Sequence, residues 1–207
     1  MDLKELQGYV IAGKREDVIN FVNKFLETDS DPNALLDQGM IPAMREIGEK
    51  FSRNEAYVPE LLIAARAMQA GLQILEPILA GTGREPKGKV AIGTVKGDLH
   101  DIGKNLVAIM LKGAGYEVLD IGVNCDASKF KTAIDDGATV IACSALLTTT
   151  MGYMEDIVKE CKTDNVKIII GGAPVTQDFA DKIGADGYSD DANKAVQLVD
   201  TFFEETA

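Results

Sequence analysis

Histidine, cysteine and tryptophan are scarce in this chain. Of its 207 residues, one is histidine (His100), three are cysteine and none is tryptophan. A single imidazole excludes, within one chain, zinc sites that need two or more histidines and mechanisms that use two. Cys125, Cys143 and Cys161 are odd in number and widely spaced, which argues against a disulfide framework or a Cys-x-x-Cys motif. We expect the three cysteines to be small core residues.

The chain is also poor in positively charged residues and in long hydrophobic runs. Lys and Arg number 21 against 33 Asp and Glu, a net charge of −12, so the chain repels phosphate backbones and we expect no nucleic-acid partner. The apolar runs are short, and the first residues, MDLKELQGYV, lack the cationic start and apolar stretch of a signal peptide. We therefore predict a cytoplasmic protein without a membrane partner. The 46% of hydrophobic residues, with 26% charged, is typical of a globular chain of one or two domains.

The first 80 residues show the apolar spacing of amphipathic helices, close to 3.6 residues. Asp31 and Pro32 are suited to the start of one helix. Pro59 and Glu60 are suited to the start of another, and Pro77 should end or kink this second helix. Residues 81–88, GTGREPKG, have the glycine, proline and charge content of an exposed linker. We predict a helical domain at 1–83, a linker or hinge at 84–88 and a second domain at 89–207.

The second domain alternates short β-rich apolar runs with helical stretches. Five strands and five helices in strict alternation predict a parallel sheet covered on both faces, and we expect a flavodoxin-like doubly wound α/β fold with strand order 2-1-3-4-5. Ligands of such sheets bind beyond the carboxyl ends of the strands. The loops after Val95, Ala145 and Gly172 are therefore where chemistry is expected. The predicted strands lie at 89–95, 116–122, 139–145, 167–172 and 185–189.

The loop after the first of these strands carries the sole imidazole. His100 lies two residues from Asp98 and one from Asp101, and either carboxylate could accept the proton of one ring nitrogen and orient the other toward a metal. The alternative is a loop in which an aspartate caps the following helix. Because the chain offers neither a second histidine nor paired cysteines, a metal held by protein ligands alone is difficult to build. A metal already held by a macrocycle needs a single axial ligand.

Three motifs together resemble the signature of cobalamin-binding domains: Asp98-x-His100-x-x-Gly103, Ser144-x-Leu146 and Gly171-Gly172. The predicted helical domain resembles the cap that precedes this domain in methionine synthase. It is equally similar to the cap of the corrinoid proteins of methanogenic and acetogenic methyltransferase systems, which serve methylamine, methanol and O-demethylase pathways. The resemblance spans residues 3–203.

The resemblance implies a role for each matched residue. The cofactor would bind base-off, its nucleotide tail buried in the α/β domain and its cobalt held by His100, with Asp98 and Thr150 completing a proton relay. Thr150 stands where methionine synthase has a serine. In the cap, Phe51, Val58 and Leu61, with Tyr57 in addition, would cover the upper face of the corrin. The implied cofactor-binding residues of the α/β domain are Gly97, Asp98, His100, Asp101, Gly103, Ser144, Leu146, Thr148, Thr150, Gly171 and Gly172.

Each of these residues also has a plainer interpretation. The glycines suit ordinary turn geometry, Leu146 suits core packing, and apolar residues beside a helix break are often core. If the resemblance holds, Gly103, Gly171 and Gly172 leave room for the nucleotide tail, Ser144 donates a hydrogen bond to it, and Leu146 packs beside it.

The resemblance also implies a function, that of a corrinoid methyl carrier which is not an enzyme on its own. Co(I) would accept a methyl group through a substrate-specific methyltransferase. Methyl-Co(III) would donate it, through a second methyltransferase, to tetrahydrofolate or coenzyme M. An ATP-dependent reductive activase would rescue oxidised cobalt. The cap would swing aside between the two steps, with the linker as its hinge.

Other classes share parts of the pattern. Adenosylcobalamin mutases carry the same histidine motif, but beside a barrel domain, for which 207 residues leave no room. Cobalamin-sensing regulators need a DNA-binding head, and no basic helix-turn-helix is visible. A flavodoxin-like signalling receiver needs an aspartate at the end of its third strand, where TVIACSA has none. An FMN carrier needs a phosphate loop after the first strand, where two acids stand instead.

Overall fold

The computed structural model describes residues 1–28, 30–80 and 85–204 and divides the chain into two compact units. The first contains Met1–Glu85 together with Gly113–Gly115, and the second contains the remainder of the chain from Pro86. Part of the predicted linker, up to residue 84, lies outside the described residues. Residues 85–88 form neither helix nor strand, and 85–87 are exposed.

The first unit is helical, as the apolar spacing predicts. Its longest helix, α5 (Val58–Ala80), packs against α1 (Leu3–Ile11), α2 (Arg15–Leu26) and α4 (Ile41–Ser52). The Asp31 side chain accepts the N–H of Asn33 at the start of the short helix α3 (Pro32–Ala34), which confirms this predicted cap. The largest side chains fully buried in this unit are Leu6, Leu35, Met40, Met44, Leu61, Met68 and Leu75.

Two features of the helical unit differ from expectation. Pro77 does not end its helix, because α5 continues to Ala80, three residues beyond the proline. Three residues are less than one further turn, so the lost N–H donor and the crowding of the proline ring against the preceding turn fall close to the end of the helix. The other expectation, a kink at Pro77, stays a prediction. Between α3 and α4, residues Leu35–Met40 form a π-helical segment rather than a regular turn of α-helix. Gly39 of that segment lies against Leu6 of α1, where a Cβ atom would come within 2.7 Å of the leucine side chain.

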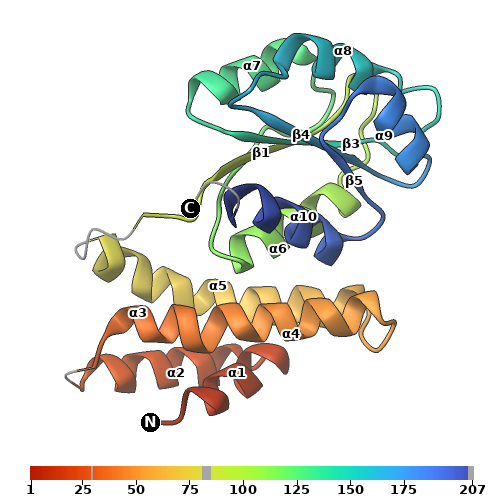
Figure 1. Cartoon of the computed structure of the whole chain (residues 1–207). Coiled ribbons are helices and arrows are strands. Elements are labelled where there is room, and N and C mark those ends of the chain that lie inside the picture. Colours follow the sequence, from red (N-terminus) through yellow and green to blue (C-terminus); the bar gives the residue numbers. More distant parts are fainter. Residues whose placement is uncertain (29, 81–84, 205–207) are drawn as a thin grey trace. The chain divides into compact units, whose positions relative to one another are not determined.

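The second unit is a five-stranded, wholly parallel sheet within the described residues, with strand order β2-β1-β3-β4-β5. Helices α6 and α10 cover one face of the sheet, and α7, α8 and α9 cover the other (Figure 1). The predicted flavodoxin-like fold and its strand order are therefore confirmed. The strands are β1 (Lys89–Thr94), β2 (Glu117–Asp120), β3 (Val140–Ser144), β4 (Lys167–Gly171) and β5 (Gly187–Ser189). The helices are α6 (Ile102–Gly113), α7 (Ala127–Asp135), α8 (Tyr153–Cys161), α9 (Gln177–Ile183) and α10 (Ala192–Glu204).

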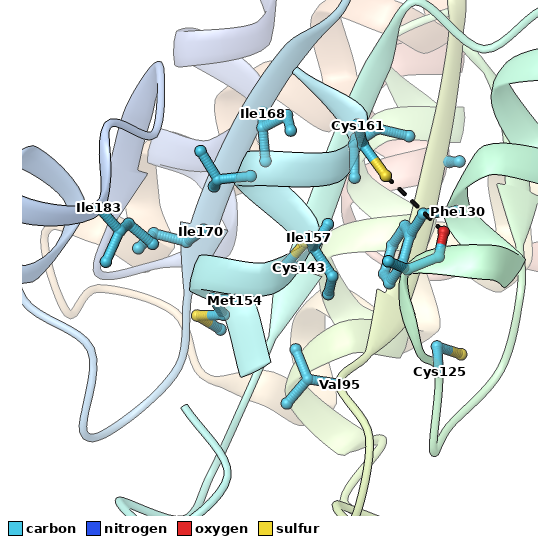
Figure 2. Close-up of a cluster of buried hydrophobic side chains, with 14 of the residues drawn as sticks. Val95, Cys125, Phe130, Cys143, Met154, Ile157, Cys161, Ile168, Ile170 and Ile183 are labelled. Carbon is cyan, nitrogen blue, oxygen red and sulfur yellow. Dashed lines mark hydrogen bonds between the residues drawn. The ribbon is translucent and has the colours of Figure 1, made fainter. Parts of the chain in front are cut away.

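The core between the sheet and helices α7 and α8 contains all three cysteines (Figure 2). Each cysteine is free and buried, and burial raises the pKa of each thiol. The Sγ–H of Cys161 donates to the carbonyl oxygen of Ala127, 3.7 Å away. The cysteines are core residues, as expected. Cys143 lies on β3, and a parallel strand covered on both faces requires a continuous apolar run.

The register of the three central strands decides where the site can form. Thr94 of β1 is paired with Ser144 of β3, and Ser144 with Gly171 of β4. The carboxyl ends of these strands therefore lie level with one another. The loops that follow them, which carry the three motifs, consequently meet at one edge of the sheet.

Candidate functional site

Asp98 lies at the centre of this edge and is fully buried. Its Oδ1 accepts the backbone N–H of His100 at 3.0 Å and faces the ring Nδ1 of the same residue at 2.7 Å. Its Oδ2 accepts the N–H groups of Leu146 and Leu147 and the hydroxyl of Thr150. Burial by itself raises the pKa of Asp98, but the hydrogen bonds from His100, Leu146 and Thr150 outweigh it and hold the pKa well below its usual range. Asp98 is thus an ionised carboxylate that joins the loops after β1 and β3.

The ionised carboxylate determines which ring nitrogen of His100 carries the proton. A carboxylate is an acceptor only, so the nitrogen facing it, Nδ1, must be the donor. The lone pair of the neutral ring is then on Nε2, which has no hydrogen-bond partner among the described residues. The side chain is 52% exposed. An imidazole held in this way through one nitrogen presents the other as a metal ligand.

Asp101 does not take part in this pair. Its Oδ2 accepts from the amide of Asn105 at 3.1 Å, and its carbonyl oxygen accepts the N–H of the same residue. Of the two carboxylates that the sequence left open as partners of the histidine, the structure brings only Asp98 to the ring. Asp98 comes close because the turn after β1 carries it toward β3, whereas Asp101 immediately precedes α6.

Thr150 completes a continuous line of polar contacts from the imidazole into the protein. Its Oγ1 lies 2.9 Å from Asp98 Oδ2 and 3.0 Å from the carbonyl oxygen of Leu147. The hydroxyl has one proton and can donate it to either acceptor. The threonine, which stands where methionine synthase is expected to have a serine, therefore still reaches the carboxylate with its oxygen.

The predicted glycines fall into two groups. No atom lies within 4 Å of the position that a Cβ atom would take at Gly103, so the space beside it is open. A Cβ atom at Gly172, where φ is +121°, would overlap the carbonyl oxygen of Ala145, and one at Gly171 would lie 2.9 Å from that of Ser189. Chain geometry by itself therefore requires glycine at 171 and 172, but not at 103. Gly97 has a φ of +79° and donates its N–H to Asn124.

Exposed apolar side chains accompany His100 on the two loops that Asp98 joins. Leu99 and Ile102, on either side of the histidine in sequence, are 72% and 78% exposed, and Leu146 and Leu147 of the second loop are also exposed. Apart from Leu146, sequence reasoning missed them, although two large apolar residues in a polar loop were a usable signal. Thr148 is exposed on the second loop. Ser144 is half-buried, and its hydroxyl has no hydrogen-bond partner in the described part of the chain.

The predicted cap residues lie around the turn between α4 and α5. Phe51 and Val58 are partly buried, Leu61 is fully buried and Tyr57 is exposed. The turn is built around Asn54, a non-glycine residue with a φ of +58°, and Glu60 accepts the N–H of Tyr57 at 3.0 Å. This arrangement is the capping-box contact of a helix start and fixes where α5 begins.

The residues at the sheet edge fit a cobalt corrinoid. In the described ranges, no cluster of three or more His, Cys, Asp and Glu side chains could hold a bare metal ion. The edge instead supplies one imidazole with a directed lone pair, apolar side chains suited to a flat macrocycle, and open space beside Gly103. A macrocycle that already occupies four positions of its metal needs only such an axial ligand.

No described helix is long and apolar enough to cross a membrane.

Comparison with known proteins identifies the family. Two family models, both described as a B12 binding domain, match residues 88–197 and 3–76. A corrinoid protein of Desulfitobacterium hafniense is 38% identical over 204 residues, which cover 95% of this chain and 94% of the relative. The trimethylamine corrinoid protein of Methanosarcina barkeri is 40% identical over 205 residues, 92% of this chain and 94% of the relative.

Solved structures agree with these relatives. A cobalamin-binding protein from D. hafniense has a TM-score of 0.80 at 26% identity and covers 97% of this chain and 98% of its own. A chain of the methanol:cobalamin methyltransferase complex MtaBC from M. barkeri has a TM-score of 0.84 at 26% identity and covers 96% of this chain and 78% of its own. The chain therefore belongs to the corrinoid proteins, a family of B12-binding proteins, and its cofactor is a cobalamin or a related corrinoid.

Proposed function

We propose that this protein is the methyl carrier of a multi-component methyltransferase system. The observation that supports this most directly is the pairing of His100 Nδ1 with the buried carboxylate of Asp98, so that Nε2 would be the nitrogen that binds the metal of the corrinoid. When bound, the corrinoid supplies a cobalt ion that can take a methyl group from one substrate and give it to another. Substrate recognition would belong to partner methyltransferases, in keeping with the methyltransferase complex that contains the solved relative from M. barkeri.

The residues of this chain control the position and charge of the axial ligand. Asp98 holds the imidazole in the Nδ1–H form, so that Nε2 can donate to cobalt. Without a metal on Nε2, this nitrogen could take up a proton, and the negative charge of Asp98 would stabilise the resulting imidazolium. Thr150 donates a hydrogen bond to the same carboxylate and limits how much of its charge reaches the ring. The chain can thus bind and release a ligand while a proton moves on or off one nitrogen.

We further propose partners and substrates that the names of the relatives make reasonable. A first methyltransferase would deliver the methyl group of a methylated amine or of methanol, and a second would pass it to tetrahydrofolate or coenzyme M. A reductive activase would restore oxidised cobalt. The residues Phe51, Val58 and Leu61, with Tyr57, would cover the reactive face, and the segment 84–88 would act as the hinge that uncovers it. We place the protein in the cytoplasm with these partners.

The replacement His100→Ala tests the axial assignment. The variant and the wild type are loaded with methylcobalamin, and their visible absorption spectra are compared. We expect the variant to retain the cofactor through its other contacts but to show the spectrum of a corrinoid without an imidazole ligand. Thr149→Ala, an exposed residue on the neighbouring loop, is the matched control and should keep the wild-type spectrum. An unchanged spectrum in His100→Ala would overturn the proposal.

A further inference from the structure

The loop that follows β2, residues 121–126, holds the histidine loop from the side opposite to β3. The N–H of Asn124 donates to the carbonyl oxygen of Asp98 at 3.0 Å, and its side-chain Oδ1 accepts the N–H of Gly97 at 2.8 Å. At the base of the loop, the N–H of Thr94 donates to the carbonyl oxygen of Gly122. One asparagine therefore binds the backbone of two successive residues, one of which carries the carboxylate that orients His100.

Asn124 makes both contacts because of an unusual backbone conformation. Its φ is +51°, in the left-handed region, where asparagine is tolerated better than other non-glycine residues. In this conformation its N–H and its side-chain oxygen both reach the turn at 97–98. Among the described non-glycine residues, only Asn54, in the turn between α4 and α5, shares this sign of φ. Glycine would allow the same backbone but could not supply the acceptor.

The start of the loop is also anchored to the helix that follows His100. The ammonium group of Lys104, on α6, lies 2.7 and 2.6 Å from the two carboxylate oxygens of Asp120, the last residue of β2. The lysine is buried, and Asp120 also accepts the N–H of Gly122. Since a buried ammonium group needs such a partner, this ion pair fixes the start of the loop against α6. The loop is thus held at its base and binds the histidine turn with its tip.

We propose that Asn124 is a positioning residue for the axial ligand. It holds the backbone at Gly97 and Asp98 so that the Asp98 carboxylate meets Nδ1 of His100 and Nε2 stays directed at cobalt. The inference rests on the proposed function for its biological meaning, but the geometry that it concerns is a property of this chain alone. Residues that position a ligand side chain in this way determine whether its geometry is precise enough for function.

Two replacements separate the side-chain acceptor of Asn124 from its backbone conformation. Asn124→Gly keeps the left-handed φ and removes the acceptor, and Asn124→Asp keeps both. Because His100 is the only histidine, its ring nitrogens give unambiguous NMR signals in the cofactor-free protein. At a pH where the ring is neutral, we expect Asn124→Gly to lower the ratio of the Nδ1–H to the Nε2–H form several-fold. Asn124→Asp should restore the wild-type ratio.

Asn54→Gly is the matched control, because it makes the same change at a left-handed asparagine in the other unit. It should leave the ring signals of His100 unchanged. After loading with methylcobalamin, the visible spectrum should show a smaller histidine-bound fraction in Asn124→Gly than in Asn124→Asp. A ring unaffected in Asn124→Gly, or affected equally in both variants, would refute the positioning role. The NMR measurement requires no cobalt, so it stays decisive even if His100→Ala refutes the axial assignment.

Discussion

Asp98 is the residue on which the geometry of the site depends. It receives hydrogen bonds from two loops that are 48 residues apart in sequence, and it is shielded from water. A buried carboxylate is stable only when its oxygens are well supplied with donors. The donors at Asp98 include the imidazole itself, so the same contacts that stabilise the charge also orient the proposed axial ligand. Folding and the proposed function therefore depend on the same hydrogen bonds to Asp98.

Thr150 allows a residue-scale prediction. Thr150→Val keeps the shape of the side chain but removes a donor from a buried carboxylate, which should lower the free energy of unfolding by about 1–3 kcal/mol. Thr150→Ser keeps the hydroxyl and removes one methyl group, which should cost about 0.8 kcal/mol. Urea unfolding of the cofactor-free proteins measures both losses. If valine cost no more than serine, the bond to Asp98 would contribute nothing to stability.

In helix α6, the fold and the proposed cofactor site place different requirements on one position. Its first turn carries Gly103, and no atom lies within 4 Å of the position that a Cβ atom would take there. Glycine within a helix is less stable than alanine because its unfolded backbone has more freedom. The fold therefore does not require glycine at 103. It does require glycine at 172, because of the backbone conformation there.

Gly103→Ala should consequently change stability and binding in opposite directions. The cofactor-free variant should be more stable by about 0.5–1 kcal/mol in urea unfolding, the usual gain for this change in a helix. Its affinity for methylcobalamin should fall, because the added methyl group occupies ligand volume. Gly8→Ala is the control, since Gly8 lies in α1 and has similarly open surroundings. It should give the same gain in stability without loss of affinity. Unaltered affinity in Gly103→Ala would remove this glycine from the proposed site.

At the scale of the whole molecule, the chain consists of two units joined near residue 85. Residues 85–87 are exposed and lie outside any helix or strand, and Lys87 is paired with Asp200 of α10 through an Nζ to Oδ1 distance of 3.5 Å. Such a joint suits the proposed hinge, because the proposed cap would have to uncover the cofactor for two different partners.

Limited proteolysis tests the joint in the intact protein. Trypsin needs several residues of accessible, irregular backbone, so we expect its first cut after Lys87, giving two large fragments that correspond to the units. The double variant Lys87→Gln with Arg84→Gln, which also removes the neighbouring tryptic site in the sequence, should slow this first cut, and the fragment masses can be read by mass spectrometry. An equally early cut within α5 or the sheet would show that the weakest backbone lies elsewhere.

Periodicity and motif spacing were enough to predict a helical region followed by a parallel sheet, the order of its strands and the edge at which the three motifs meet. They were not enough to choose between Asp98 and Asp101, because both are close to His100 in sequence and only the path of the turn separates them. Nor did the sequence indicate Asn124 or the Lys104–Asp120 pair. Their partners lie on other elements, and no local pattern encodes a contact across a sheet edge.

The sequence alone indicated the class of chemistry through three motifs that resemble those of cobalamin-binding domains, and its single imidazole is compatible with a metal that arrives inside a macrocycle. It also determined the fold, since alternating apolar runs of strand and helix length can be buried only around a parallel sheet. The tertiary structure alone decided how the imidazole is held. Five hydrogen-bond donors converge on one buried carboxylate, and this convergence depends on the level ends of β1 and β3, which are distant in the chain and adjacent only after folding.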